Sequence, residues 1–167
     1  AFTEAHNKAA VAGVWQAIPF KDENFDEINT TSISGASIGQ VYRGSISGQQ
    51  IVIKVKRPGI EKIVAQDLKV LKKILPLALR FVDPNLRYSA KAMLSQFIET
   101  VYEEMDYTVE SKNLKRIKND MKESNQVIVP SVYDDYSSKN VLTMEYLPGI
   151  KVTDVQALNE KGIDREQ

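Results

Sequence analysis

The spacing of apolar residues divides the chain into stretches of helical and of strand character. Residues 1 to about 19 are Ala-rich with helical spacing, and residues 21–27 are polar. From about residue 30 to 57 the apolar spacing changes to two and β-branched residues dominate, which is typical of strands. Ser47-Gly48 lies between two such runs and predicts a tight hairpin turn, while Pro58-Gly59 predicts the end of the second run.

Two helices are predicted after these strands. Residues 60–82 carry apolar residues at steps of three and four, and Pro76 is expected to kink this helix or end it near Leu75. A long helix is predicted from Ser89, as its N-cap, to about Lys122. The apolar stripe of the first helix either packs on the sheet as ordinary core, which is the commoner outcome, or docks a partner helix or a membrane surface. The stripe includes Leu71, Leu75, Leu79 and Phe81.

Strand character returns twice near the end of the chain. Residues 127–133 and 140–146 are rich in β-branched and aromatic residues, with the polar segment 134–139 between them and a Pro-Gly exit after them. The predicted order is three strands, two helices and two strands. Such an order favours an α+β fold, with a single antiparallel sheet of about five strands and helices packed on it.

The composition is that of an ordinary globular domain. Its 22 basic and 22 acidic residues cancel, so we expect no nucleic-acid partner. The chain has no Cys and one His, which argues against disulfides and against thiolate or His-based metal sites, so no metal ligand is assigned within it. We see no signal peptide and no apolar run that could span a bilayer. The expected location is cytoplasmic, either free or peripheral to a membrane.

A small-residue loop and a strand lysine are the first candidate chemistry. The loop, Ser34-Gly-Ala-Ser-Ile-Gly-Gln-Val41, lies between two predicted strands, and Lys54 follows in the next strand. Small residues let a backbone approach phosphates closely, and a strand lysine can pair with those phosphates. Because strand side chains alternate, Lys54 points away from Ile53 and Val55. It is either an edge-strand residue in solvent or a partly buried cation that needs an anion. The loop favours the second interpretation.

Acidic residues at helical spacing offer such an anion. Four of them recur at steps of four, three and four: Glu99, Glu103, Asp106 and Glu110. In one unbroken helix all four lie on one face, whereas Glu104 lies about 100° around the helix from Glu103. This face is either a solvated acidic surface, as most charge runs are, or the source of a Lys–Glu pair that holds Lys54 against phosphates.

Four segments in this order resemble one known family. They are the loop at 34–41, the strand at 51–60, an E-x-D segment at 104–113, and the strand pair at 129–133 and 141–149. Together they lie within residues 30 to about 152 and resemble the UbiB-like atypical kinase family, which is linked to ubiquinone and other isoprenoid-lipid metabolism. The resemblance implies a protein-kinase-like N-terminal lobe with a long C-type helix and an inserted helical segment.

The resemblance also implies roles for individual residues. Lys54 contacts phosphates, and Glu110 is its helix partner. Glu104 and Asp106 form the family's acidic motif, so that these four residues are assigned catalytic roles. The backbone of Glu145 and Leu147 is the expected adenine hinge, with Met144 at the back of the pocket. The expected ATP-binding residues are Gly35, Ala36, Ser37, Ile38, Val41, Lys54, Met144, Glu145 and Leu147.

The family's catalytic loop and D-F-G segment do not follow Gly149. We therefore expect one lobe that needs the C-terminal lobe of the same protein, which would supply the Mg²⁺ ligands. The expected organisation is an N-terminal helical extension (1–29), the kinase-like lobe (30–152) and the start of an inter-lobe or C-lobe segment (153–167). The expected function of the whole is that of an ATP-dependent atypical kinase or ATPase supporting isoprenoid-quinone or lipid metabolism. The alternative is a non-catalytic interaction or membrane-surface module that retains the lobe fold.

Overall fold

The computed structural model describes residues 25–29, 31–35, 38–81 and 83–163, so the predicted helix over 1–19 lies outside the described residues. The strands are β1 (Glu27–Ile28), β2 (Ser34–Gly35), β3 (Gly39–Ile46), β4 (Gln49–Lys56) and β5 (Val141–Glu145). The helices are α2 (Ile60–Ala78), α3 (Pro84–Glu104), α4 (Tyr107–Asp120) and α5 (Val155–Glu160), with single 3-10 turns η2 (Leu79–Phe81) and η3 (Asp134–Tyr136).

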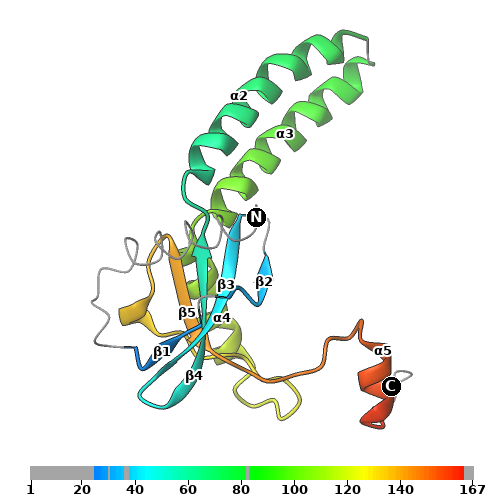
Figure 1. Cartoon of the computed structure of the whole chain (residues 1–167). Coiled ribbons are helices and arrows are strands. Elements are labelled where there is room, and N and C mark those ends of the chain that lie inside the picture. The colour runs from blue at the N-terminus through cyan, green and yellow to red at the C-terminus, as the bar shows by residue number, and fades with distance from the viewer. Residues whose placement is uncertain (1–24, 30, 36–37, 82, 164–167) are drawn as a thin grey trace.

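All five strands form one antiparallel sheet, which confirms the α+β prediction (Figure 1). The order is β1-β3-β4-β5, and β2 pairs with β3 beside β1. Across the middle of the sheet, Lys54 on β4 lies opposite Val41 on β3 and opposite Leu142 on β5. Strand β4 is therefore a central strand, hydrogen-bonded on both sides.

The β3–β4 turn is where the sequence predicts it. Ser47 and Gly48 form a two-residue loop with φ values of 50° and 75°. Two consecutive positive φ angles are the mark of a type I′ turn, whose twist matches that of paired strands. Gly59, with φ 77°, then ends the extended segment and precedes α2. The Ser47-Gly48 turn returns the chain along the sheet, and Gly59 directs it away from the end of the sheet into α2.

The hydrophobic core lies on one face of the sheet. Its buried members come from β3, β4 and β5, and the partly buried residues that pack on them come from the segments before β1 and around η3. They are Tyr42, Ile46, Ile51, Ile53, Val55 and Val141, covered by Phe25, Ile28, Tyr133 and Tyr136. Since strand side chains alternate, the opposite face carries Lys54 and receives α4.

The predicted strand over 127–133 is wrong. This segment has no regular strand, and only its end reaches β5, through an isolated bridge between Val132 and Met144 and the backbone hydrogen bonds of the residues on either side of Val132. Val127 and Ile128 are 46% and 78% exposed. Pro130 lacks an N–H and so cannot donate to a ladder in the middle of the run. The sheet still has five strands because the short strands β1 and β2 belong to it.

The predicted single helix from 89 to 122 is also wrong. Helix α3 begins earlier, at Pro84, and ends at Glu104, and α4 begins at Tyr107. Proline is well suited to the first position of a helix, where its missing N–H has no intrahelical partner to lose. Asp106 lies between the two helices as the N-cap of α4. The break changes which acidic residues can lie together.

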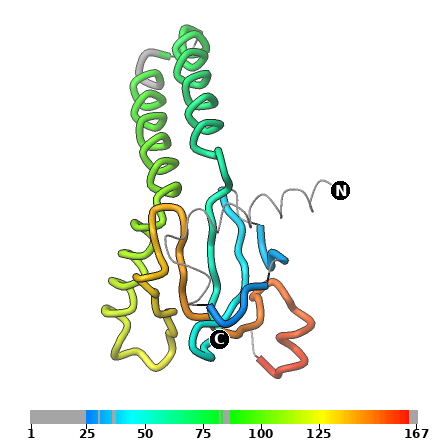
Figure 2. Tube along the Cα trace, turned by 60° about the vertical axis from the view of Figure 1, so that its left-hand side comes forward, coloured from blue at the N-terminus to red at the C-terminus, as the bar shows by residue number. Residues whose placement is uncertain are grey.

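Helices α2 and α3 lie side by side and project beyond the end of the sheet (Figures 1 and 2). Because this hairpin leaves the sheet, the expectation that the α2 stripe packs on the sheet is wrong: within the stripe Leu79 is buried, but Leu71 and Phe81 are 36% and 90% exposed. Pro76 does not end α2, which continues to Ala78. Among the described residues, no helix is long and apolar enough to cross a membrane.

Candidate functional site

The candidate site centres on an ion pair between the sheet and α4. Lys54 Nζ lies 2.6 Å from Glu110 Oε2, and the two side chains are 20% and 38% exposed. Because β4 is a central strand, the interpretation of Lys54 as an edge-strand residue in solvent is excluded. A partly buried ammonium requires an anionic partner, and α4 provides it.

Tyr107, the first residue of α4, lies under the same ammonium. Its ring centroid is 4.9 Å from Lys54 Nζ, within the range of a cation–π contact, and its side chain is 1% exposed. Burial, together with the negative charges of Glu110 and Glu104, raises the pKa of Tyr107 to about 12. The phenol therefore remains neutral at physiological pH and keeps its proton as a hydrogen-bond donor. Sequence reasoning did not assign a role to Tyr107, although this residue directly follows Asp106 in the E-x-D segment.

The hydroxyl of Tyr107 has no hydrogen-bond partner within the described part of the chain. Leaving a buried hydroxyl unpaired costs about 1–3 kcal/mol, so such groups are rare. The hydroxyl lies beside Gly39, where a side-chain Cβ would overlap it and would come within 2.7 Å of the Val55 carbonyl oxygen. Only glycine fits there, at the point where the small-residue loop enters β3.

The two acidic residues of the E-x-D segment are separated by the helix break. Glu104 is exposed at the end of α3. Asp106 Oδ1 accepts hydrogen bonds from the Thr108 backbone N–H at 3.0 Å and from the Thr108 hydroxyl at 2.7 Å. These bonds, with the charges of Lys139 and Lys56, lower the pKa of Asp106. The prediction of one continuous acidic face from Glu99 to Glu110 fails, because the backbone changes direction at Asp106.

The loop residues lie at the turn between β2 and β3. Gly35 pairs with Gln40, and Ser34 pairs with Val41, so the chain reverses between them. The Ile38 carbonyl accepts from the Arg57 N–H at 2.9 Å, which ties the end of the loop to the end of β4. Ala36 and Ser37 are among the residues that the structure does not describe.

The register places two of the expected pocket residues on the same face as Lys54. Val41 is its direct cross-strand neighbour. Met144 lies opposite Val52, which shares that face because it is two residues from Lys54. A nucleotide under this face would therefore meet apolar side chains beside a cation.

Glu145 points to the other face of the sheet. Its carboxylate accepts from the Ser131 N–H at 3.1 Å and from the Ser131 hydroxyl at 2.9 Å, which lowers the pKa of Glu145. Its own N–H donates to the Ser131 carbonyl at 2.8 Å. An adenine contact at this residue would therefore have to use the Glu145 carbonyl oxygen. Leu147 follows β5 without regular secondary structure.

A cavity of about 360 Å³ lies on the helix side of Lys54, lined by residues of α3 and α4 that include Glu103, Glu104, Glu110 and Asn113. Three carboxylates against one ammonium make it unsuitable for phosphates, which carry the same charge as the carboxylates. Within the described ranges, no group of three or more acidic or His residues is arranged to hold a metal ion. Any phosphate at Lys54 would therefore approach from the loop side.

An antiparallel five-stranded sheet, with a central-strand lysine paired to a helix glutamate, is the architecture of the N-terminal lobe of protein-kinase-like folds. The model of the ABC1 atypical kinase-like domain matches residues 19–167. The chain belongs to this family, which confirms the resemblance to UbiB-like proteins.

Individual relatives agree with this assignment. The chloroplastic protein ACTIVITY OF BC1 COMPLEX KINASE 8 of Arabidopsis thaliana is 39% identical over 87% of this chain and 19% of that protein. A probable protein kinase UbiB of Haemophilus ducreyi is 33% identical over 83% of this chain and 27% of that protein. The chain thus spans about a fifth to a quarter of these relatives' length.

One solved structure shares the fold. The Rv3197–erythromycin complex from Mycobacterium tuberculosis aligns with a TM-score of 0.70 over 92% of this chain and 41% of that one. At 21% sequence identity, this likeness supports the kinase-like architecture and nothing about ligands.

Proposed function

We propose that the chain is the ATP-binding lobe of an ABC1-type atypical kinase or ATPase, in which Glu110 holds Lys54 against the nucleotide's phosphates. The observation that carries this proposal is the 2.6 Å pair between a central strand and α4. Such a pair fixes an otherwise flexible ammonium at one position, and a fixed cation is what phosphate binding requires. The whole protein would use this site in isoprenoid-quinone or lipid metabolism.

The surrounding residues suit one orientation of a nucleotide, with its phosphates toward the loop and its base toward apolar side chains. The small residues of the loop at 34–41 suit a backbone that approaches phosphates, while Val41 and Met144 offer apolar contact to a base. ATP would supply the phosphoryl group. The Mg²⁺ ligands and the catalytic base would come from a second lobe of the same protein, as in other kinase-like folds.

Nucleotide binding by the full-length protein tests this proposal. Lys54→Ala should weaken ATP binding by about 10- to 100-fold, because hydrogen bonds to charged groups contribute more than neutral ones. Glu110→Gln should weaken it less, since Lys54 keeps its charge but loses its fixed position. Isothermal titration with ATP gives both affinities.

Lys72→Ala is the matched control, because Lys72 is an exposed lysine of α2 in the projecting hairpin. It should bind ATP like the wild type. If Lys54→Ala also binds ATP like the wild type, Lys54 is not the phosphate contact and the proposed function is wrong.

A second candidate function concerns the projecting α2–α3 hairpin. Phe81, Tyr88 and Met93 are 90%, 81% and 72% exposed, although each is large and apolar or aromatic. Residues 60–81 carry five Lys or Arg against two acidic residues. Exposed apolar side chains combined with positive charge favour an anionic lipid surface. We propose peripheral membrane attachment through this hairpin, which co-sedimentation with anionic liposomes would measure.

A further inference from the structure

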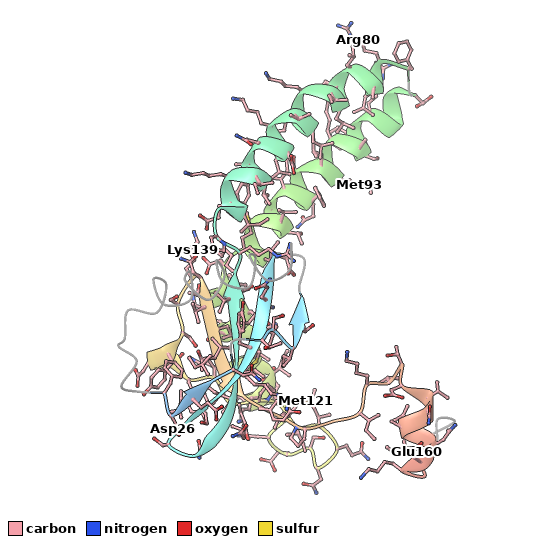
Figure 3. The ribbon with its side chains drawn as sticks, in the orientation of Figure 1. Asp26, Arg80, Met93, Met121, Lys139 and Glu160 are labelled. Atoms are coloured by element: carbon pink, nitrogen blue, oxygen red, sulfur yellow. The ribbon has the colours of Figure 1, made fainter. Side chains whose placement is uncertain are left out.

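Tyr107 connects the two parts of the candidate site. Its ring lies under Lys54, and its hydroxyl lies beside Gly39 at the entry of the loop into β3. Its backbone N–H donates to the Lys139 carbonyl at 3.2 Å, which fixes where α4 begins (Figure 3 labels Lys139 near the end of the sheet). One side chain on a fixed backbone therefore contacts both the cation and the loop.

The hydroxyl is not explained by packing alone. A phenylalanine would fill the same space and make the same contact with the Lys54 ammonium. The hydroxyl adds a buried donor that has no acceptor among the described residues. Gly39, at the end of the loop, lies next to the hydroxyl, so a change in the loop would let the hydroxyl donate a hydrogen bond to the loop backbone there.

On the basis of the proposed ATP-binding function, we propose that Tyr107 is a positioning residue of the nucleotide site. Its ring holds the Lys54 ammonium, and its hydroxyl supports the loop at Gly39 in the conformation that receives phosphates. Tyr107 thus contacts both the loop and the Lys54–Glu110 pair, so it sets the distance between the loop and the Lys54 ammonium.

Tyr42 provides a matched comparison within the same sheet. It is equally buried, at 1% exposure, but lies on the core face, and its hydroxyl donates to the Gln40 side chain. Removal of the Tyr42 hydroxyl breaks a buried hydrogen bond and should destabilise the fold. Removal of the Tyr107 hydroxyl breaks none within the described residues, so it should not destabilise the protein without nucleotide.

The experiment compares Tyr107→Phe, Tyr107→Leu and Tyr42→Phe in the full-length protein. Titration calorimetry gives the affinities for ATP and for adenosine, and thermal unfolding without nucleotide gives the Tm. Tyr107→Phe should weaken ATP binding by about 3- to 10-fold, the effect of one hydrogen bond formed only in the nucleotide-bound state, with adenosine affinity and Tm preserved. Tyr107→Leu should lose a further factor of about 3 to 10 for ATP, because the ring is gone.

Tyr42→Phe should show the opposite pattern, with a lower Tm and unchanged ATP affinity. The assignment is overturned if Tyr107→Phe binds ATP like the wild type, if ATP and adenosine affinities fall together, or if its Tm falls as that of Tyr42→Phe does. A wild type that binds no ATP overturns the proposed function and this assignment with it. A wild type whose ATP binding depends on Lys54 but not on Tyr107 overturns this assignment alone.

Discussion

At the scale of single residues, Asp106 has a structural role as the N-cap of α4, whatever part it plays in catalysis. Its carboxylate accepts two hydrogen bonds from Thr108 and caps α4, so the direction of the helix that carries Glu110 and Tyr107 depends on it. An N-cap is a common use of aspartate because its oxygen satisfies an N–H that has no intrahelical partner. A loss of function on mutation of Asp106 therefore needs a stability measurement beside it.

Asp106→Ala should lower the free energy of unfolding by about 1 kcal/mol, the usual effect of losing an N-cap, whereas Asp106→Asn should keep the cap. The hydrogen bonds lower the pKa of Asp106 in the folded state. Its stabilisation is therefore complete above the unfolded-state pKa of about 4 and is lost as the pH falls through the folded-state value. Relative to Asp106→Asn, the wild type should lose stability below about pH 4.

Urea unfolding between neutral pH and about pH 3 measures this difference, with both proteins compared at each pH. Glu145 also has a lowered pKa, and it affects both proteins equally because its shift comes from Ser131 and Lys118 and not from Asp106. A constant difference between wild type and Asp106→Asn at every pH would contradict the role of the Asp106 carboxylate.

Sequence reasoning predicted correctly that Lys54 points to the face opposite Ile53 and Val55, because side chains alternate strictly between the two faces of a strand. It did not find Tyr107. An aromatic residue in a helix ordinarily indicates core, and the features that distinguish Tyr107 are an unpaired hydroxyl and a cation above the ring. Both depend on residues more than 50 positions away in the sequence, which no local pattern reports.

At the scale of elements, turns were more predictable than helix boundaries. The Ser47-Gly48 turn is chosen by residues that tolerate positive φ, which is a local property. The helix break at Asp106 is not indicated by the local sequence pattern, because the acidic and apolar spacing continues across it. What stops α3 is the return of the chain to the sheet, where Met105 and Tyr107 are buried.

The turn gives a prediction at the element scale. Gly48→Ala should destabilise the protein by about 1 kcal/mol, because a side chain at φ 75° is strained even though the surrounding space is open. Gly149→Ala is the control, since Gly149 also has open space but lies outside the positive-φ region. Denaturant midpoints measure both. Equal effects of the two substitutions would show that backbone strain at Gly48 is not the cause.

At the scale of the whole molecule, the α2–α3 hairpin lies outside the hydrophobic core of the sheet, and the Lys56–Glu61 ion pair joins its base to β4. The hydrophobic core of the sheet contains no residue of α2 or α3 among those that form or cover it. Figure 3 shows Arg80 at the far end of the hairpin, remote from Lys139 at the end of the sheet. The proposed nucleotide site belongs to the sheet and α4, so the hairpin should be dispensable for ATP binding and required only for what it contacts outside this lobe.

Shortening the hairpin tests this division. Removal of residues 71–92, with a short Gly-Ser turn joining Val70 to Met93, deletes the outer part of both helices together with Phe81 and Tyr88, the two most exposed large apolar or aromatic residues of the hairpin. In the full-length protein the variant should keep the ATP affinity of the wild type, because Lys54, Tyr107 and Glu110 are untouched. It should lose co-sedimentation with anionic liposomes. Retained lipid binding would place any membrane contact elsewhere, and lost ATP binding in a folded variant would show that the hairpin supports the site.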